Sequence, residues 1–142
     1  MSAPHLIRRK LVIHPEFHQV DMMGVVHNAQ YFLWFEEGRL QISFEVLPLG
    51  EAIRRGVAMP VVHNSCHYQQ PVRYGDELVL YTTHRLQTEY EGRLEFEHSL
   101  VHAATKVEAA SGVTVATLVD FNTNELIVRW PDDLWQRYQA LK

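Results

Sequence analysis

The chain has 142 residues, of which 46% are hydrophobic and 21% charged, with a net charge of −4 at pH 7. This length suits one domain over residues 1–142, and the acidic balance argues against a general nucleic-acid or anionic-membrane surface. The single cysteine, Cys66, excludes an intrachain disulfide and a thiolate-rich metal site. We see no signal peptide and no apolar run long enough to span a bilayer, so we expect a cytoplasmic protein without membrane contact.

The predicted elements alternate little between helix and strand, which indicates an α+β fold rather than a parallel α/β fold. In chain order we predict a strand over 8–17, a long helix over 29–47, a short helix over 50–55, a strand over 57–70 with a kink at Pro60, a turn over 71–76, strands over 77–87, 93–103 and 112–121, and a C-terminal helix over 131–142. Short turns join the later strands, so we expect an antiparallel sheet of about five strands with one central helix on its face.

The long helix is the strongest helical segment of the sequence. Asn28 is its predicted N-cap, because an Asn side chain can accept from the free N–H groups of a first helical turn. Its apolar residues lie on two sides, which predicts a helix that is buried all round. One side holds Tyr31, Phe35, Gly38, Ile42 and Val46, and the other holds Leu33, Leu40, Phe44 and Leu47.

An isolated carboxylate, Asp21, stands just ahead of this helix. An Asp before a glycine turn often only caps a loop, and that interpretation stays open. A carboxylate can also act as a general base or as a nucleophile, so a catalytic role is the alternative. The free backbone N–H groups at the helix start, near residues 27–29, suit the stabilisation of an oxyanion.

The stretch DxxGVVHNAxY and the later RYGD turn resemble the hotdog-fold acyl-CoA thioesterases of the 4-hydroxybenzoyl-CoA thioesterase type. The resemblance runs from about residue 8 to residue 129. It implies a hotdog fold and an acyl-CoA substrate with no further cofactor. It also implies a homo-oligomer, a dimer or a dimer of dimers, with the active site between subunits. By this resemblance the catalytic candidates are Asp21, Gly24, His27 and the backbone N–H of Asn28, and the substrate-binding candidates are Val26, Tyr31, Glu36 and Arg73.

Several alternatives remain open at this point. His27 could assist a proton transfer or simply be hydrogen-bonded at the helix entry, and Glu36 could serve as a reserve base or pair with Arg39. His98 and His102 lie about 13 Å apart on a strand, too far to share an ion, so we predict no metal site. The alternative functions are a hotdog hydro-lyase acting on enoyl thioesters and a non-catalytic acyl-CoA-binding module.

Overall fold

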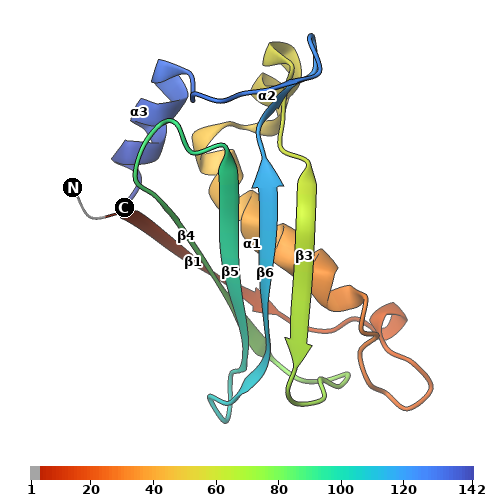
Figure 1. The fold of residues 1–142 in the computed structure, drawn as a ribbon. Helices are drawn as coiled ribbons and strands as arrows, with labels where there is room; N and C mark the ends of the chain where they lie inside the picture. The colour runs from red at the N-terminus through yellow and green to blue at the C-terminus, as the bar shows by residue number, and fades with distance from the viewer. Residues whose placement is uncertain (1–3) are drawn as a thin grey trace.

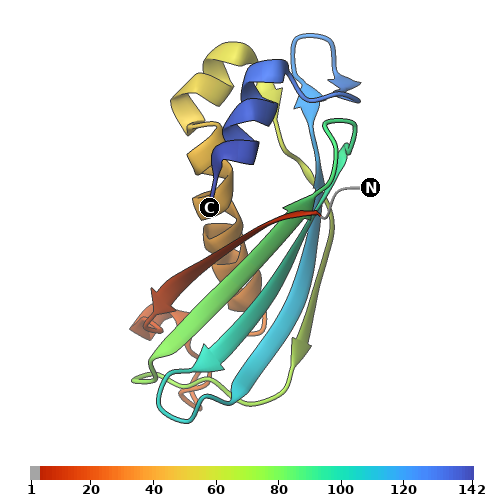
Figure 2. The same cartoon turned by 90° about the vertical axis from the view of Figure 1, so that its left-hand side faces the viewer.

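The computed structural model describes residues 4–142, and its main element is a five-stranded antiparallel sheet of order β1-β4-β5-β6-β3. The long helix α1 lies along one face of this sheet (Figures 1 and 2). The elements are β1 (His5–Ile13), the 3-10 turn η1 (Phe17–Gln19), α1 (Gln30–Val46), α2 (Leu49–Arg55), β2 (Val57–Ala58), β3 (Val61–Tyr68), β4 (Leu78–Leu86), β5 (Arg93–His102), β6 (Glu108–Thr117), β7 (Val119–Asp120), β8 (Glu125–Leu126) and α3 (Asp132–Ala140). The predicted α+β hotdog arrangement is confirmed.

The predicted strand over 57–70 is divided into two elements that belong to different sheets. Proline has no N–H to donate to the hydrogen-bond ladder of a sheet, and the chain passes from the small sheet to the main sheet at Pro60. The part before it, β2, pairs with β7, and β7 pairs with β8, forming a small three-stranded sheet that the sequence did not predict. The part after it, β3, is an edge strand of the main sheet.

The helix α1 is buried on one side only, so the expectation of burial all round is wrong for the single chain. Its buried residues follow helical spacing and form one stripe toward the sheet: Tyr31, Trp34, Phe35, Gly38, Arg39, Ile42 and Val46. On the other side Leu33 and Phe44 are exposed. Among residues 4–142, no helix is long and apolar enough to cross a membrane.

The predicted N-cap of α1 is also wrong. Ala29, not Asn28, holds the N-cap position, and it has helical dihedral angles of φ −70° and ψ −24° with no side-chain cap. The Gln30 N–H instead donates to the carbonyl oxygen of His27 at 3.0 Å, and the Phe32 N–H donates to Ala29 at 3.2 Å. A tight turn over residues 27–29 therefore leads into the helix and makes a side-chain cap unnecessary.

Two glycines allow the helix and the sheet to approach closely. Gly38 of α1 faces Thr82 and Leu80 of β4, and a Cβ at Gly38 would lie 2.9 Å from Leu80 Cδ2 and still closer to Thr82 Oγ1. Gly112 of β6 lies under the ring of Phe35 in the same way. These contacts fix the distance between α1 and the strands.

A buried polar network runs across the sheet at the same level. His98 Nδ1 lies 3.1 Å from Thr82 Oγ1, and His98 Nε2 lies 3.0 Å from Thr114 Oγ1. The Thr114 hydroxyl donates to Asn64 Oδ1 at 2.9 Å, so its oxygen is free to accept from His98 Nε2–H, and the Thr82 hydroxyl donates to Nδ1. The imidazole of His98 stacks on the ring of Phe35, with 4.4 Å between the ring centroids. A neutral His98 thus links helix α1 to the polar network of the sheet.

Replacement of Gly38 by alanine should destabilise the protein by about 1–3 kcal/mol, because the added methyl group forces α1 away from β4. Gly50 is the matched control, since it lies in the exposed first turn of α2 and a Cβ there would meet only the flexible end of the Arg54 side chain of the same helix, at 3.4 Å. Gly50→Ala should be neutral or stabilising. Urea unfolding measures both, and equal effects of the two variants would contradict the close-approach argument.

The free energy of unfolding should fall in acid because of His98. Burial, helped by the positive charge of Arg39, lowers the pKa of His98 from 6.5 to about 3. Below pH 6.5 the unfolded chain therefore binds a proton that the folded chain does not, and unfolding becomes easier down to about pH 3. Between pH 7 and pH 5 this amounts to at most about 2 kcal/mol.

Urea unfolding at both pH values should show a smaller acid loss in His98→Gln than in the wild-type protein. The buried His84, whose pKa is also lowered by burial, remains in both proteins and does not affect the difference. His63→Gln is the control for the loss of a histidine side chain as such, because His63 is exposed on β3. An acid loss in His98→Gln as large as that of the wild type would refute the assignment.

Candidate active site

The loop between residues 20 and 26 is held at both ends, and it carries Asp21 and Gly24. Val20 bridges to Val26 within the loop, and Val25 bridges to Arg73 of the RYGD turn. The Val26 N–H donates to the Val72 carbonyl at 2.8 Å. Gly24 has a φ of +74°, a left-handed conformation that glycine adopts without strain, and its carbonyl accepts from Tyr74 at 3.1 Å. The turn over 71–76 thus holds this loop in place.

Asp21 is half-buried, and one of its carboxylate oxygens is fixed by the loop itself. Oδ1 accepts from the backbone N–H of Met23 at 2.8 Å and from that of Val25 at 3.3 Å. Within residues 4–142, Oδ2 has no hydrogen-bond partner. The carboxylate therefore closes the turn, as the simpler interpretation expected, and also presents a free oxygen in a defined orientation.

The helix start offers fewer free donors than the sequence suggested. The His27 N–H donates to the Gln19 carbonyl at 3.0 Å, so His27 cannot supply an oxyanion donor from its backbone. The N–H groups of Asn28 and Ala29 have no acceptor in the described part of the chain. Both residues are exposed. Asn28 is held from the other side, because the Tyr68 hydroxyl of β3 donates to its carbonyl at 2.6 Å.

The interior wall of this end of the molecule is aromatic. Tyr31 is 3% exposed, and its ring meets the Tyr68 ring edge-on at 4.8 Å and the Trp34 ring at 5.4 Å. Burial raises the pKa of Tyr31 to about 12, so its hydroxyl stays neutral. Val26 is also buried, in the same apolar cluster. These side chains form a wall behind the loop, and Tyr68, which the sequence did not single out, connects that wall to the helix start.

The remaining candidates are not gathered into one cluster. Glu36, His27 and Arg73 are exposed, and none of their side chains makes a hydrogen bond or ion pair with another part of residues 4–142. The expected Glu36–Arg39 ion pair does not form, because Arg39 turns into the core. The described residues include no group of three or more His, Cys, Asp or Glu side chains that could hold a metal ion.

Comparison with known proteins supports the family assignment. The model of the thioesterase-like superfamily matches residues 15–138. A Bacillus subtilis protein named as a candidate acyl-CoA thioesterase, YneP, is 32% identical over 79 residues, which cover 55% of this chain and 56% of that protein. The matches span about half the length of the curated relatives.

Solved structures show the same fold at low sequence identity. The 1,4-dihydroxy-2-naphthoyl-CoA thioesterase Slr0204 from Synechocystis is similar with a TM-score of 0.80 and 21% identity, over 94% of this chain and 96% of that one. An Asp-to-Asn mutant of 4-hydroxybenzoyl-CoA thioesterase, complexed with 4-hydroxybenzoyl-CoA, is similar with a TM-score of 0.76 and 15% identity, over 92% of this chain and 97% of that one. With the family model matching most of its length, the chain belongs to the thioesterase-like superfamily.

Proposed function

We propose that this protein hydrolyses acyl-CoA thioesters to a free acid and coenzyme A, with Asp21 as general base or nucleophile. The observation that carries the proposal is the Asp21 carboxylate, which is anchored through Oδ1 and free at Oδ2, just ahead of a helix whose Asn28 N–H is unpaired within residues 4–142. Membership of the thioesterase-like superfamily supports the reaction class. No cofactor is needed, since coenzyme A is part of the substrate.

In the general-base route, Asp21 Oδ2 takes a proton from water, and the resulting hydroxide attacks the thioester carbonyl. In the nucleophilic route, Oδ2 attacks the carbonyl itself and water then hydrolyses the mixed anhydride. In both routes the carbonyl oxygen becomes negative, and the Asn28 N–H at the positive end of α1 is the proposed donor to it. In the general-base route the C–S bond then breaks, and the protonated Asp21 returns its proton to the departing thiolate. In the nucleophilic route the C–S bond breaks as the anhydride forms, and the thiolate takes up a proton released when water hydrolyses the anhydride. Both routes end with coenzyme A as a free thiol, the acyl group as the acid and Asp21 as a carboxylate.

The proposed substrate class is supported by the names of similar proteins and by the side chains around the Asp21 loop. Two of the similar structures are named as thioesterases of aromatic CoA esters, and YneP is named as a candidate acyl-CoA thioesterase. In this chain Val26 and Tyr31 supply the apolar wall, Gly24 lets the backbone pass close to the thioester, and exposed Arg73 and Glu36 are candidates for contacts with the CoA portion.

We also propose that the active protein is a homo-oligomer paired through β3. This edge strand exposes backbone hydrogen-bonding groups together with Val61, Val62 and Tyr68, and such edges favour pairing with a second strand. Because Tyr68 contacts Asn28, a partner paired along β3 would lie beside the loop that carries Asp21. Apolar side chains around that loop are also exposed and would be covered: Phe17, Met22, Met23 and Tyr74.

Replacement of Asp21 by asparagine should reduce the turnover rate by at least ~10²-fold, the low end for a lost general base. The asparagine Oδ1 can still accept from the Met23 and Val25 N–H groups, so the thermal melt should change little. Affinity for a CoA ester should also be preserved. The measurement is thiol release from a panel of CoA thioesters, beside a ligand titration on the same preparation.

His27→Ala is the matched control for this measurement, because His27 is exposed beside the same loop. Its turnover rate should remain within about tenfold of the wild type, or ~1.4 kcal/mol in barrier height. A near wild-type rate in Asp21→Asn would make Asp21 a turn residue and Glu36 the next carboxylate to test. A thousandfold loss of turnover in His27→Ala, together with hydration of an enoyl-CoA instead of thiol release by the wild-type protein, would favour the hydro-lyase. Binding of CoA esters without turnover would favour the non-catalytic module.

The oligomer should dissociate when a charge is placed on the β3 edge. Val62 and Val12 are matched positions, since they are 58% and 55% exposed on opposite edge strands, β3 and β1. Val62→Lys should give a monomer by light scattering and lose most of its thioesterase activity, because lysine at a strand edge opposes pairing. Val12→Lys should keep the wild-type mass and activity. A monomeric wild-type protein with full activity would contradict an active site shared between subunits.

A further inference from the structure

Arg39, in the middle of α1, is buried and forms no ion pair within residues 4–142. It is 7% exposed, and its Nε atom is fully buried with no hydrogen-bond partner in the described part of the chain. No carboxylate of residues 4–142 lies within ion-pair distance of its guanidinium, and Glu36 on the same helix is exposed. A buried charge without a partner is costly, so such an arrangement is expected where an anion completes it.

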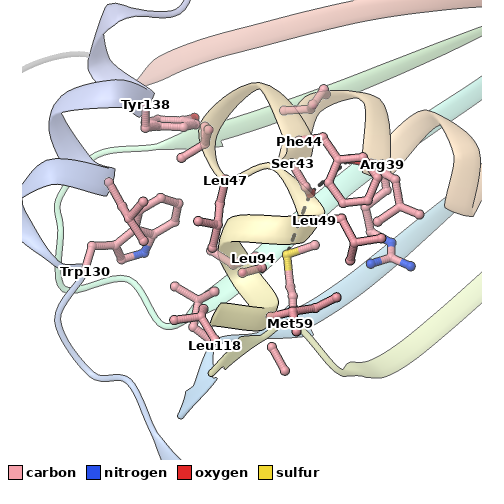
Figure 3. A pocket seen from close by; sticks show the side chains of 18 of the residues that line it. Arg39, Ser43, Phe44, Leu47, Leu49, Met59, Leu94, Leu118, Trp130 and Tyr138 are labelled. Carbon is pink, nitrogen blue, oxygen red and sulfur yellow. Dashed lines mark hydrogen bonds between the residues drawn. The ribbon is translucent and has the colours of Figure 1, made fainter. Parts of the chain in front are cut away.

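The same side chain lines a cavity of about 700 Å³ between α1, α2, α3 and the sheet. This volume is typical of small-molecule sites. Figure 3 shows Arg39 at one end of the cavity and Trp130 at the other, with Met59, Leu94 and Leu118 on the walls between them. The lining is almost entirely apolar.

Arg39 is the single fully charged side chain in the described lining. The other titratable groups there are His84, whose pKa is lowered by burial, and Tyr138, whose pKa is raised by burial, so both are neutral at pH 7. A ligand with several phosphates would leave most of its charge unpaired in this cavity. A ligand with one negative charge at one end and an apolar body matches both the charge and the shape.

We propose that this cavity binds a free carboxylic acid with an apolar chain, its carboxylate on Arg39 and its chain directed toward Trp130. The guanidinium is a planar fork that can donate two parallel hydrogen bonds to one carboxylate. Burial of the chain against Met59, Leu94 and Leu118 adds affinity with each methylene group that leaves water. The alcohol of the same chain offers no charge to Arg39 and should bind more weakly.

The acid site is separate from the proposed thioesterase site. Arg39 lies nine residues beyond Gln30, or about 14 Å along the helix axis, and none of the catalytic or substrate-binding candidates lines the cavity. Binding of a free acid therefore requires neither a CoA ester nor Asp21. This inference goes beyond the proposed hydrolysis and does not depend on it.

Calorimetric titration of the full chain with decanoate and with decan-1-ol tests the site without any thioester. Decanoate should bind the wild type at least about tenfold more tightly than the alcohol, as expected for a charge-assisted pair. It should also change the tryptophan fluorescence, because Trp130 lines the cavity. Equal affinities for acid and alcohol in the wild-type protein would overturn the proposal without recourse to any variant.

Variants of Arg39 locate the interaction. Arg39→Met should lose the preference for decanoate over the alcohol, and Arg39→Lys should keep part of it. Arg54→Met is the matched control, because Arg54 is exposed on the neighbouring helix and does not line the cavity; its affinities should equal those of the wild type. Decanoate binding that is unchanged in Arg39→Met would overturn the assignment.

The melting temperature distinguishes a ligand-binding role of Arg39 from a purely structural one. An arginine kept for a ligand costs stability in the free protein, so Arg39→Met should melt at the same temperature as the wild type or higher. Added decanoate should raise the melting temperature of the wild type but not that of Arg39→Met. A lower melting temperature or an altered oligomeric mass in Arg39→Met, with no decanoate effect on the wild type, would mean that Arg39 has a structural partner instead.

Discussion

The close approach of α1 to the sheet is the constraint on which the rest of the structure depends. Gly38 meets Thr82 and Leu80 with no side chain between them, and the ring of Phe35 lies over Gly112. Interiors pack at the density of organic crystals, so these contacts allow the helix little freedom to shift. Because the position of the helix is fixed here, the place where its N-terminus emerges is fixed as well, and with it the N–H of Asn28, which no acceptor in residues 4–142 reaches.

The loop with Asp21 gains its order from segments far away in the chain. Val72 and the turn after it hold one side of the loop, and Tyr68 reaches the carbonyl of Asn28 from β3. Asp21 then fixes its own carboxylate through the backbone N–H groups of the loop. The proposed catalytic role of Asp21 needs a fixed orientation of this kind, and backbone hydrogen bonds of the loop supply it.

One helix carries two different electrostatic environments. Its start is exposed, and within residues 4–142 the N–H groups of Asn28 and Ala29 have no acceptor, which suits a transient negative charge. Its middle is buried, and there Arg39 lies near the neutral His98, whose pKa its charge helps to lower. Burial also lowers the pKa of Arg39 itself. The helix thus has a solvent-accessible start and a buried middle, where Arg39 is the charged side chain in the described lining of the apolar cavity.

The sequence by itself determined the order of the three helices and of the main strands, the alternation of β5 and the motif that surrounds Asp21, because these depend on local periodicity and short-range turn chemistry. Only the tertiary structure decided the division at Pro60 into two sheets, the loss of the Asn28 cap, the pairing of the His27 N–H with Gln19 and the burial of Arg39 away from Glu36. Each of these depends on which segments meet across the fold. Local spacing carries no information on such contacts, since hydrogen-bond partners and burial are set by register and packing between elements distant in the chain.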